Sequence, residues 1–233
     1  MPETLIKEPE TRSSVTVSNG IYAKYIKRPM DFVLSLCAII VLSPILLVLT
    51  VIGAIVMKGN PIFVQERPGK IDPKTGKERI FKLIKFRTMT CEKDKDGKLL
   101  PDDQRLTPYG YWLRKCSLDE LLELINILKG DMSIVGPRPL LPEYLPYYTE
   151  TEHHRHDVRP GLSGLAQANG RNIVSWDKRI NLDLYYVSHI SFLMDFKIIC
   201  KTIIIVFRRE GISVESMENF DDYRKKEILE QKQ

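Results

Sequence analysis

The distribution of hydrophobic and polar positions along the chain predicts one membrane segment followed by a water-soluble region. Residues 30–57, MDFVLSLCAIIVLSPILLVLTVIGAIVM, form the single long apolar run, and Asp31 is its only charged residue. A straight helix over this run would be roughly 42 Å long, whereas the hydrocarbon core of a bilayer is about 30 Å thick. The run is therefore long enough to span a membrane with a tilt or to bend inside it.

Two features favour a helix that bends inside the membrane and returns to the same side. Pro44, near the middle of the run, removes a backbone hydrogen bond and kinks or breaks a helix, and the Ser43 hydroxyl can bond a freed carbonyl. Basic residues also flank the run on both sides, whereas a spanning helix is depleted of them on one side. Hydropathy alone slightly favours a kinked spanning helix. With the flanks included, we expect a re-entrant helix broken at Ser43-Pro44, its basic ends against anionic lipids.

After the apolar run, the pattern predicts a β-hairpin. Residues 61–69 have the composition of a short strand, and residues 80–89 alternate apolar and basic side chains as a half-exposed strand does. The turn signal at residues 72–76 lies between them. The hairpin would present three basic side chains, Lys82, Lys85 and Arg87. The simplest alternative is that they form a solvated strand face.

Helical patterns follow. Residues 117–129 place five apolar side chains on one stripe before Gly130, which ends the helix. A shorter helix over 106–115 starts at Thr107-Pro108 and carries aromatic residues that suit either the core or a membrane interface. Residues 191–209 predict an amphipathic helix too polar to span a bilayer. The charged residues 215–233 predict a solvated helix or a frayed tail.

The composition of the chain indicates which kind of partner it favours. A net charge of +5 and a pI near 8.9 favour anionic partners such as phosphate groups, nucleic acid or acidic lipids. The four cysteines show no metal-binding spacing, which predicts reduced thiols in a cytosolic setting. Residues 1–20 are polar and predict a mobile tail without the apolar core of a signal peptide.

The adjacent acids Asp119 and Glu120 are the main candidate for chemistry. From these residues alone a structural role is favoured, because Ser117-Leu-Asp-Glu120 matches a capping box and acids complement the helix dipole. The functional alternative is that both carboxylates, with Arg114 and Arg138 nearby, bind a hard cation together with a diphosphate.

Two further segments suggest binding sites. His153, His154 and His156 resemble a metal cluster, but histidines this close in sequence rarely converge on one ion, so we expect surface or hydrogen-bonding roles. The glycine-rich residues 159–172 match neither a Walker loop nor a dinucleotide fingerprint. Their backbone amides and arginines remain candidates for holding a phosphate or a nucleobase.

Several unusual motifs occur in one order between about residues 22 and 220. They are KRPMDF, Ser43-Pro44, Gln65-Glu-Arg-Pro-Gly69, Lys85-Phe-Arg-Thr-Met89, Ser117-Leu-Asp-Glu120, Lys129-Gly-Asp-Met-Ser133, Gly136-Pro-Arg-Pro139, Arg155-His-Asp-Val-Arg-Pro-Gly161 and Asn169-Gly-Arg-Asn172. Together they make the chain resemble the bacterial sugar transferases, specifically the small monotopic phosphoglycosyl transferases.

The resemblance implies a mixed α/β, mostly helical fold in the bacterial inner membrane, with its catalytic domain in the cytoplasm. The expected parts are a flexible tail (1–20), a re-entrant helix (21–58), a catalytic domain with a short β-hairpin and interfacial amphipathic helices (59–212), and a charged tail (213–233).

The resemblance also implies a two-step reaction. Asp119 would attack the β-phosphorus of a UDP-sugar and release UMP, and polyprenyl phosphate, such as undecaprenyl phosphate, would then take the phosphosugar from the aspartyl intermediate. Mg²⁺ would lie near Asp119 and Glu120. Arg114, Arg138 and Arg171 match phosphate-contacting positions. Lys85 and Arg87 are further candidates for binding the substrate phosphates.

This chain departs from the family pattern at two positions. Many members continue the acidic pair with Leu-Pro-Gln, whereas here Leu121-Leu122-Glu123 follows, and we expect Glu123 to be an exposed helix charge. Cys116 stands where a polar residue is usual.

Other functions and partners stay open. A membrane-tethered scaffold that binds anionic lipid or partner enzymes also fits the composition. Nucleic-acid binding is disfavoured because the basic residues share no single face. The resemblance favours an N-acetylated UDP-sugar as donor, with glucose or galactose as alternatives. A homodimer is neither required nor excluded, and the glycan made, whether O-antigen, capsule, exopolysaccharide or glycoprotein glycan, is undetermined.

Overall fold

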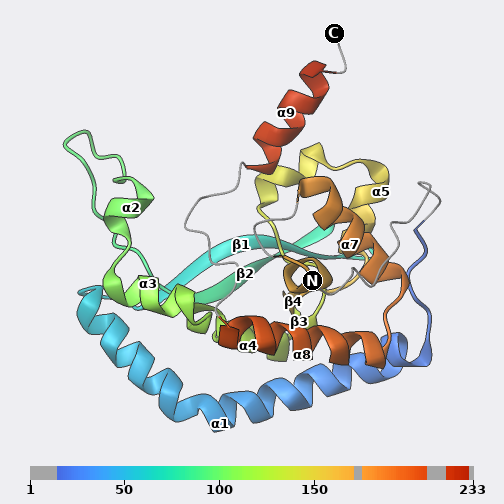
Figure 1. Cartoon of the computed structure of the whole chain (residues 1–233), viewed down its shortest axis with the longest axis horizontal. Coiled ribbons are helices and arrows are strands. Elements are labelled where there is room, and N and C mark those ends of the chain that lie inside the picture. The colour runs from blue at the N-terminus through green and yellow to red at the C-terminus, as the bar shows by residue number, and fades with distance from the viewer. Residues whose placement is uncertain (1–14, 171–174, 209–218, 231–233) are drawn as a thin grey trace.

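The computed structural model describes residues 15–170, 175–208 and 219–230 (Figure 1). In chain order the elements are η1 (Tyr22–Ile26), α1 (Lys27–Val56), β1 (Ile62–Ile71), β2 (Glu78–Phe86), α2 (Asp102–Arg105), α3 (Pro108–Lys115), η2 (Leu118–Glu120), α4 (Glu123–Lys129), β3 (Ser133–Val135), η3 (Pro142–Tyr147), α5 (Glu150–His153), η4 (His154–His156), β4 (Gly161–Ser163), α6 (Leu165–Ala168), α7 (Trp176–Ser188), α8 (Phe192–Arg208) and α9 (Phe220–Glu230). This confirms the mostly helical fold with a long apolar N-terminal helix and a hairpin.

The apolar run forms α1, which changes direction near its middle (Figure 1). Pro44 lies inside the helix, and the helix continues on both sides of it. Because proline has no N–H, the Ile40 carbonyl loses its usual helical donor. The Ser43 hydroxyl replaces that donor at 2.8 Å. The predicted break at Ser43-Pro44 is therefore a bend in a continuous helix.

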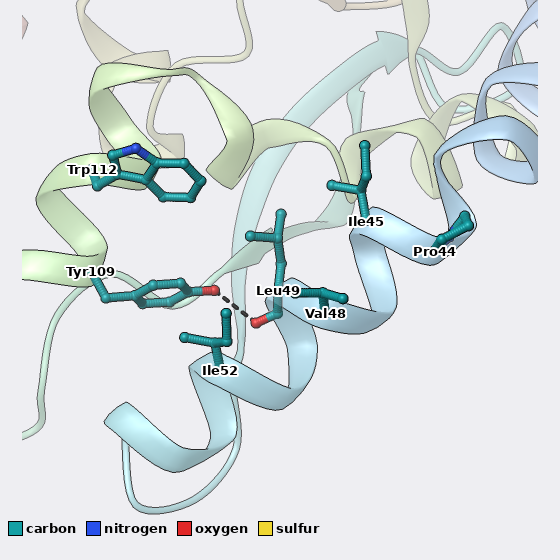
Figure 2. Close-up of a pocket in the computed structure, with 7 residues that line it drawn as sticks. All are labelled: Pro44, Ile45, Val48, Leu49, Ile52, Tyr109 and Trp112. Atoms are coloured by element: carbon teal, nitrogen blue, oxygen red, sulfur yellow. Dashed lines mark hydrogen bonds between the residues drawn. The ribbon is translucent and has the colours of Figure 1, made fainter.

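Both halves of α1 are attached to the rest of the protein. In the first half, Arg28 donates to two carbonyls at the end of α4, and Asp31 accepts a hydrogen bond from the Ser133 hydroxyl at 2.7 Å. In the second half, the Leu49 carbonyl accepts a hydrogen bond from the Tyr109 hydroxyl at 2.7 Å (Figure 2). In Figure 1, α1 lies along the lower edge with the other described elements above it.

Within the described residues, one helical stretch, Tyr22–Val56, is long and apolar enough to cross a bilayer. Little of its surface is buried against the protein. A second apolar surface lies on α8, where five large apolar side chains are exposed: Phe192, Leu193, Phe196, Ile203 and Ile204. The opposite side of α8 faces the core, because Asp195 and Ile198 are buried there.

The hairpin forms as the sequence predicts. β1 and β2 pair antiparallel, with Ile62 opposite Phe86, and the turn at residues 72–76 connects them. Phe81 and Leu83 of β2 pack against α4 and Met132. The fully buried Asn126 of α4 fixes this packing, because its side chain accepts from the Ile84 amide at 3.0 Å and donates to the Lys82 carbonyl at 2.8 Å.

One glycine of the 159–172 segment, Gly161, lies in a second sheet that the sequence did not predict. Gly161 begins β4, which pairs parallel with β3. A Cβ atom on Gly161 would lie 2.1 Å from the Gly136 nitrogen, so a side chain there would prevent the two segments from meeting. The amides of Gly136 and Gly161 donate to the Ser163 and Pro137 carbonyls. These two amides therefore bond within the protein and are not available to a phosphate.

The two predicted tails are partly attached to the body. Ser18 donates two hydrogen bonds, from its amide to the Val187 carbonyl in the last turn of α7 and from its hydroxyl to the Ile190 carbonyl just after that helix. Near the other end, Phe220 is fully buried and begins α9. Residues 1–14, 209–218 and 231–233 lie outside the described residues.

We predict that Asn126→Ala destabilises the protein by about 2–3 kcal/mol, because it leaves buried backbone groups of β2 without partners. Thermal unfolding in detergent measures the change. The matched control is Asn60→Ala, which removes an exposed side-chain bond to the Ile62 amide and should cost less than about 1 kcal/mol. Equal shifts for the two variants would contradict the role of Asn126.

Candidate active site

The acidic pair lies on a short turn between α3 and α4. Ser117 has a left-handed backbone with φ of 55°, and the 3-10 turn Leu118–Glu120 follows it before α4 begins at Glu123. An N-cap residue typically has an extended backbone, and the Ser117 side chain makes no capping hydrogen bond to the turn, so the predicted capping box is wrong. The predicted helix over 117–129 is correspondingly interrupted. Leu118 and Leu121 anchor the turn in an apolar cluster below it.

Glu120 is held by two cations. Its Oε1 accepts from the Lys85 ammonium at 2.9 Å and from the Arg138 guanidinium at 2.6 Å. Burial by itself would raise the pKa of Glu120, but the charges and hydrogen bonds of Arg138 and Lys85 outweigh burial and hold the pKa well below its usual value. Glu120 is therefore ionised and fixed in place.

Asp119 differs from its neighbour. Among the described residues, none donates a hydrogen bond to its carboxylate, although Lys85, Arg114 and Arg138 are near enough to stabilise its negative charge. Burial raises the pKa of Asp119, the charge of Glu120 raises it further, and the three cations oppose that change. Arg114 is oriented by a 3.1 Å hydrogen bond from its Nε to the Thr88 hydroxyl. Asp119 is thus a carboxylate beside cations and without a donor of its own.

Glu123 corrects the expectation of an exposed charge. Its side chain is 2% exposed, and its Oε1 lies 2.9 Å from the Lys85 ammonium in an ion pair that lacks hydrogen-bond geometry. The reason is that α4 starts at Glu123 and packs against β2, which carries Lys85. Burial, with the charge of Glu120 adding to it, raises the pKa of Glu123 to about 7.

Arg138 is positioned by a buried residue, Arg155, for which the sequence analysis predicted no individual role. The guanidinium of Arg155 donates to the Arg138 carbonyl at 2.9 Å, to Asp183 at 2.7 Å and to the Tyr148 hydroxyl at 2.9 Å. Arg155 and Asp183 are both almost completely buried. The Arg155-His-Asp-Val motif indicated that this segment is important. It did not indicate that Arg155 pairs with Asp183, which is 28 positions away.

The other candidate residues are placed as follows. Arg87 follows the end of β2, is partly exposed, and has no ion pair with a carboxylate among the described residues. Arg171 lies outside the described residues. His153 and His154 bond to Glu78 and Asp157, as expected of hydrogen-bonding residues. His156 is buried, and burial lowers its pKa well below the usual value, so it is not a surface residue.

The acidic turn has enough ligands for Mg²⁺ only if phosphate oxygens of a substrate also bind the ion. Within the described residues, no group of three or more histidine, cysteine, aspartate or glutamate side chains could hold a metal alone. Glu120 Oε1 is occupied by two cations, which leaves its other oxygen and the Asp119 carboxylate. Mg²⁺ commonly uses one or two carboxylates and completes its shell with water and substrate phosphates. The donors at the turn match that pattern.

Comparison with known proteins places the chain in a family. The model of the family "Bacterial sugar transferase" matches residues 22–209. The chain is 54% identical over 155 residues to the uncharacterized sugar transferase EpsL of Bacillus subtilis, a match that covers 66% of this chain and 74% of EpsL. The chain therefore belongs to the bacterial sugar transferase family, which confirms the resemblance of its motifs.

Two relatives have names that specify a reaction. The undecaprenyl-phosphate galactose phosphotransferase of Salmonella typhimurium is 35% identical over 208 residues, which cover 81% of this chain and 42% of that protein. An Aeromonas hydrophila relative, named UDP-N-acetylgalactosamine-undecaprenyl-phosphate N-acetylgalactosaminephosphotransferase, is 37% identical over 206 residues, covering 83% and 46%. The chain matches less than half the length of these two proteins.

We predict that Glu123→Gln stabilises the protein at alkaline pH. The carboxyl pKa is about 7 in the folded state against an ordinary 4.5, so wild-type stability falls as the pH rises through this interval. The neutral amide removes that loss, giving up to about 3 kcal/mol more stability than wild type at pH 8 and little difference at pH 4. Unfolding in detergent at both pH values measures it.

The control for this prediction is Glu66→Gln, which changes an exposed side chain on β1 and should leave the pH dependence of unfolding unaltered. A Glu123→Gln protein less stable than wild type at pH 8 would mean that the ion pair with Lys85 outweighs the cost of burying the carboxylate.

Proposed function

We propose that this protein transfers a phosphosugar from a UDP-sugar to polyprenyl phosphate and releases UMP through a covalent aspartyl intermediate. The observation that carries the proposal is the asymmetry of the acidic pair. Glu120 is fixed by Lys85 and Arg138, whereas Asp119 has no donor among the described residues and lies beside the same cations. A carboxylate that attacks phosphorus needs this freedom, and the phosphate under attack needs the cations.

The proposed reaction has two steps. A carboxylate oxygen of Asp119 bonds to the β-phosphorus, and the bond from that phosphorus to the oxygen bridging the two phosphates breaks, so UMP leaves with the electron pair. A phosphate oxygen of the polyprenyl phosphate then bonds to the same phosphorus and breaks the bond to Asp119. The products are UMP and a polyprenyl diphosphosugar, and the Asp119 carboxylate is regenerated.

Cations of the chain stabilise both steps. Lys85, Arg114 and Arg138 offset the negative charge of the diphosphate and of the departing UMP. Mg²⁺, which we propose as the cofactor, would be held by Asp119 and Glu120 and would neutralise further phosphate charge. Glu120 keeps Lys85 and Arg138 close together, so that their charges act at the same place.

The relatives' names support the substrate classes and leave the sugar open, since one names galactose and another N-acetylgalactosamine. We propose an N-acetylated UDP-sugar as donor and undecaprenyl phosphate as acceptor. The reaction would be the first membrane step in the synthesis of a bacterial glycoconjugate.

We further propose that α1 is re-entrant and that the catalytic domain lies on the cytoplasmic side of the inner membrane. The support is that both halves of α1 bond to the same protein body. A helix crossing the bilayer would carry one of its ends to the opposite side, away from that body. Basic residues at both ends of α1 favour the cytoplasmic face.

The reaction is tested by measuring UMP release from UDP-sugars in the presence of polyprenyl phosphate. Asp119→Asn should lower UMP release at least about a thousandfold and abolish the covalent phosphosugar adduct detected by mass spectrometry, because the amide is a poor nucleophile. Asp103→Asn, at an exposed position, is the matched control.

Three results would contradict this function in different ways. Turnover and an adduct retained in Asp119→Asn would remove Asp119 as the nucleophile. Release of UDP would indicate direct glycosyl transfer. No product from any UDP-sugar would favour the membrane-tethered scaffold.

The topology is tested by cysteine labelling in intact cells. In a variant without its native cysteines, single cysteines at Lys24 and Gly59 flank α1, and one at Asp103 marks the soluble domain. We expect an impermeant reagent to label all three only after the inner membrane is opened. Labelling of Lys24→Cys and Gly59→Cys from opposite sides would refute the re-entrant helix.

A further inference from the structure

Arg67 of β1 shares a face of the hairpin with Lys85, which bonds Glu120 in the candidate active site. Arg67 lies opposite Phe81 of β2, and directly opposite residues of an antiparallel pair lie on the same face. Lys85 joins Phe81 and Leu83 on that face, because side chains alternate along a strand. Phe81 and Leu83 pack against α4. Arg67 is therefore on the side of the hairpin that faces α4 and the acidic turn.

The guanidinium of Arg67 is incompletely paired within the protein. It donates one hydrogen bond, to the side-chain oxygen of Gln65 at 2.7 Å. Its Nε is buried and has no acceptor among the described residues. The nearby carboxylates of Glu120 and Glu123 form ion pairs with other cations, and none in the described part of the chain pairs with Arg67. A buried charged donor without an acceptor is costly, which points to an acceptor supplied by a ligand.

Arg138 is a second guanidinium beside Arg67. The residue after Arg67, Pro68, packs with Arg138 around one small space. Burial lowers the pKa of Arg67 and the charge of Arg138 lowers it further, whereas Glu123 and Glu143 oppose that change. Both groups stay charged, because arginine is not deprotonated in proteins. The Arg138 side chain is 38% exposed and Arg67 is partly exposed, so an anionic ligand can reach both.

The proposed reaction brings two phosphates to one place in succession. An in-line displacement has the entering and the leaving oxygen on opposite sides of the phosphorus. Asp119 enters in the first step and leaves in the second, so it stays on one side throughout. The opposite side holds first the phosphate of the departing UMP and then the phosphate of the polyprenyl acceptor. Both are phosphate monoesters, so the same cations suit both.

We infer that Arg67 and Arg138 bind the phosphate monoester that faces Asp119 across the reacting phosphorus, in UMP first and in the lipid acceptor afterwards. This inference rests on the proposed function, which supplies both phosphates. Arg138 joins this place to the acidic pair, since it bonds Glu120 at 2.6 Å and lies beside Arg67. A planar guanidinium can bond two phosphate oxygens at once. Arg67 binds and orients the phosphate and forms no covalent bond in either step.

Binding of small ligands to the full-length protein in detergent tests this inference without turnover. Wild type should bind UMP more tightly than uridine, and farnesyl monophosphate more tightly than farnesol. Arg67→Gln should reduce both preferences at least about tenfold, because a charge-assisted hydrogen bond to phosphate is lost. The matched control is Arg79→Gln on the same hairpin, where the native side chain is 72% exposed, and it should leave both preferences unchanged.

The stability of the ligand-free protein distinguishes a binding role from a structural one. Arg67→Gln should unfold at a temperature no lower than wild type, because it removes a cation that has no carboxylate partner and lies beside Arg138. A purely structural role predicts earlier unfolding with unchanged ligand preferences. Arg67→Lys keeps the charge but not the planar pair of donors, so it should retain only part of each preference. It serves as the second variant if Arg67→Gln folds poorly.

Competition between the two monophosphates tests the shared site. UMP should displace farnesyl monophosphate from wild type, whereas simultaneous binding of both would overturn the shared site. Unchanged preferences in Arg67→Gln and Arg67→Lys, or a wild type that does not distinguish UMP from uridine, would overturn the role of Arg67. The proposed reaction is judged separately, by UMP release and by the Asp119 adduct. Phosphate preferences that depend on Arg67 would support this site even if Asp119→Asn retained turnover.

Discussion

The meeting of two cations on one oxygen of Glu120 is the interaction on which the site depends. Lys85 comes from β2 and Arg138 from the segment after β3, and neither is near Glu120 in sequence. Removing charged groups from water is costly unless each has a partner. Because Glu120 satisfies both cations, the hairpin, the acidic turn and the segment after β3 are held together at one point. Asp119 is placed beside these cations because it is covalently next to Glu120.

Buried polar side chains outside the acidic turn hold Lys85 and Arg138 in position. Asn126 ties α4 to the strand that carries Lys85. Arg155 holds the backbone of Arg138 while it pairs with Asp183. Lys85 and Arg138 are therefore held by contacts to buried residues, unlike charged side chains that move freely on a protein surface. This would favour binding of the proposed diphosphate substrate, because little side-chain conformational entropy is then lost when the phosphate binds.

The sequence predicted the elements whose pattern is local. The apolar run, the hairpin and the start of α3 follow from residues that are neighbours in the chain, and Ser43 compensates Pro44 within one helical turn. It did not predict features that depend on distant contacts. Glu123 has the pattern of an exposed charge, yet Lys85 on β2 lies against it. Ser117 is the first residue of a sequence that matches a capping box, yet its backbone is left-handed in the structure. The turn that follows it packs Leu118 and Leu121 into an apolar cluster.

The position of α1 beside the acidic turn also depends on contacts between residues far apart in the sequence. For the proposed polyprenyl acceptor, leaving the bilayer to reach Asp119 would cost about 0.8 kcal/mol for each methylene exposed to water. The attachment of both halves of α1 to the soluble body places an apolar helix directly beside the acidic turn. The bend at Pro44 makes this attachment possible, because a straight helix of 30 residues could not follow the body at both ends. The proline thus allows both halves of the apolar helix to be attached near the acidic turn.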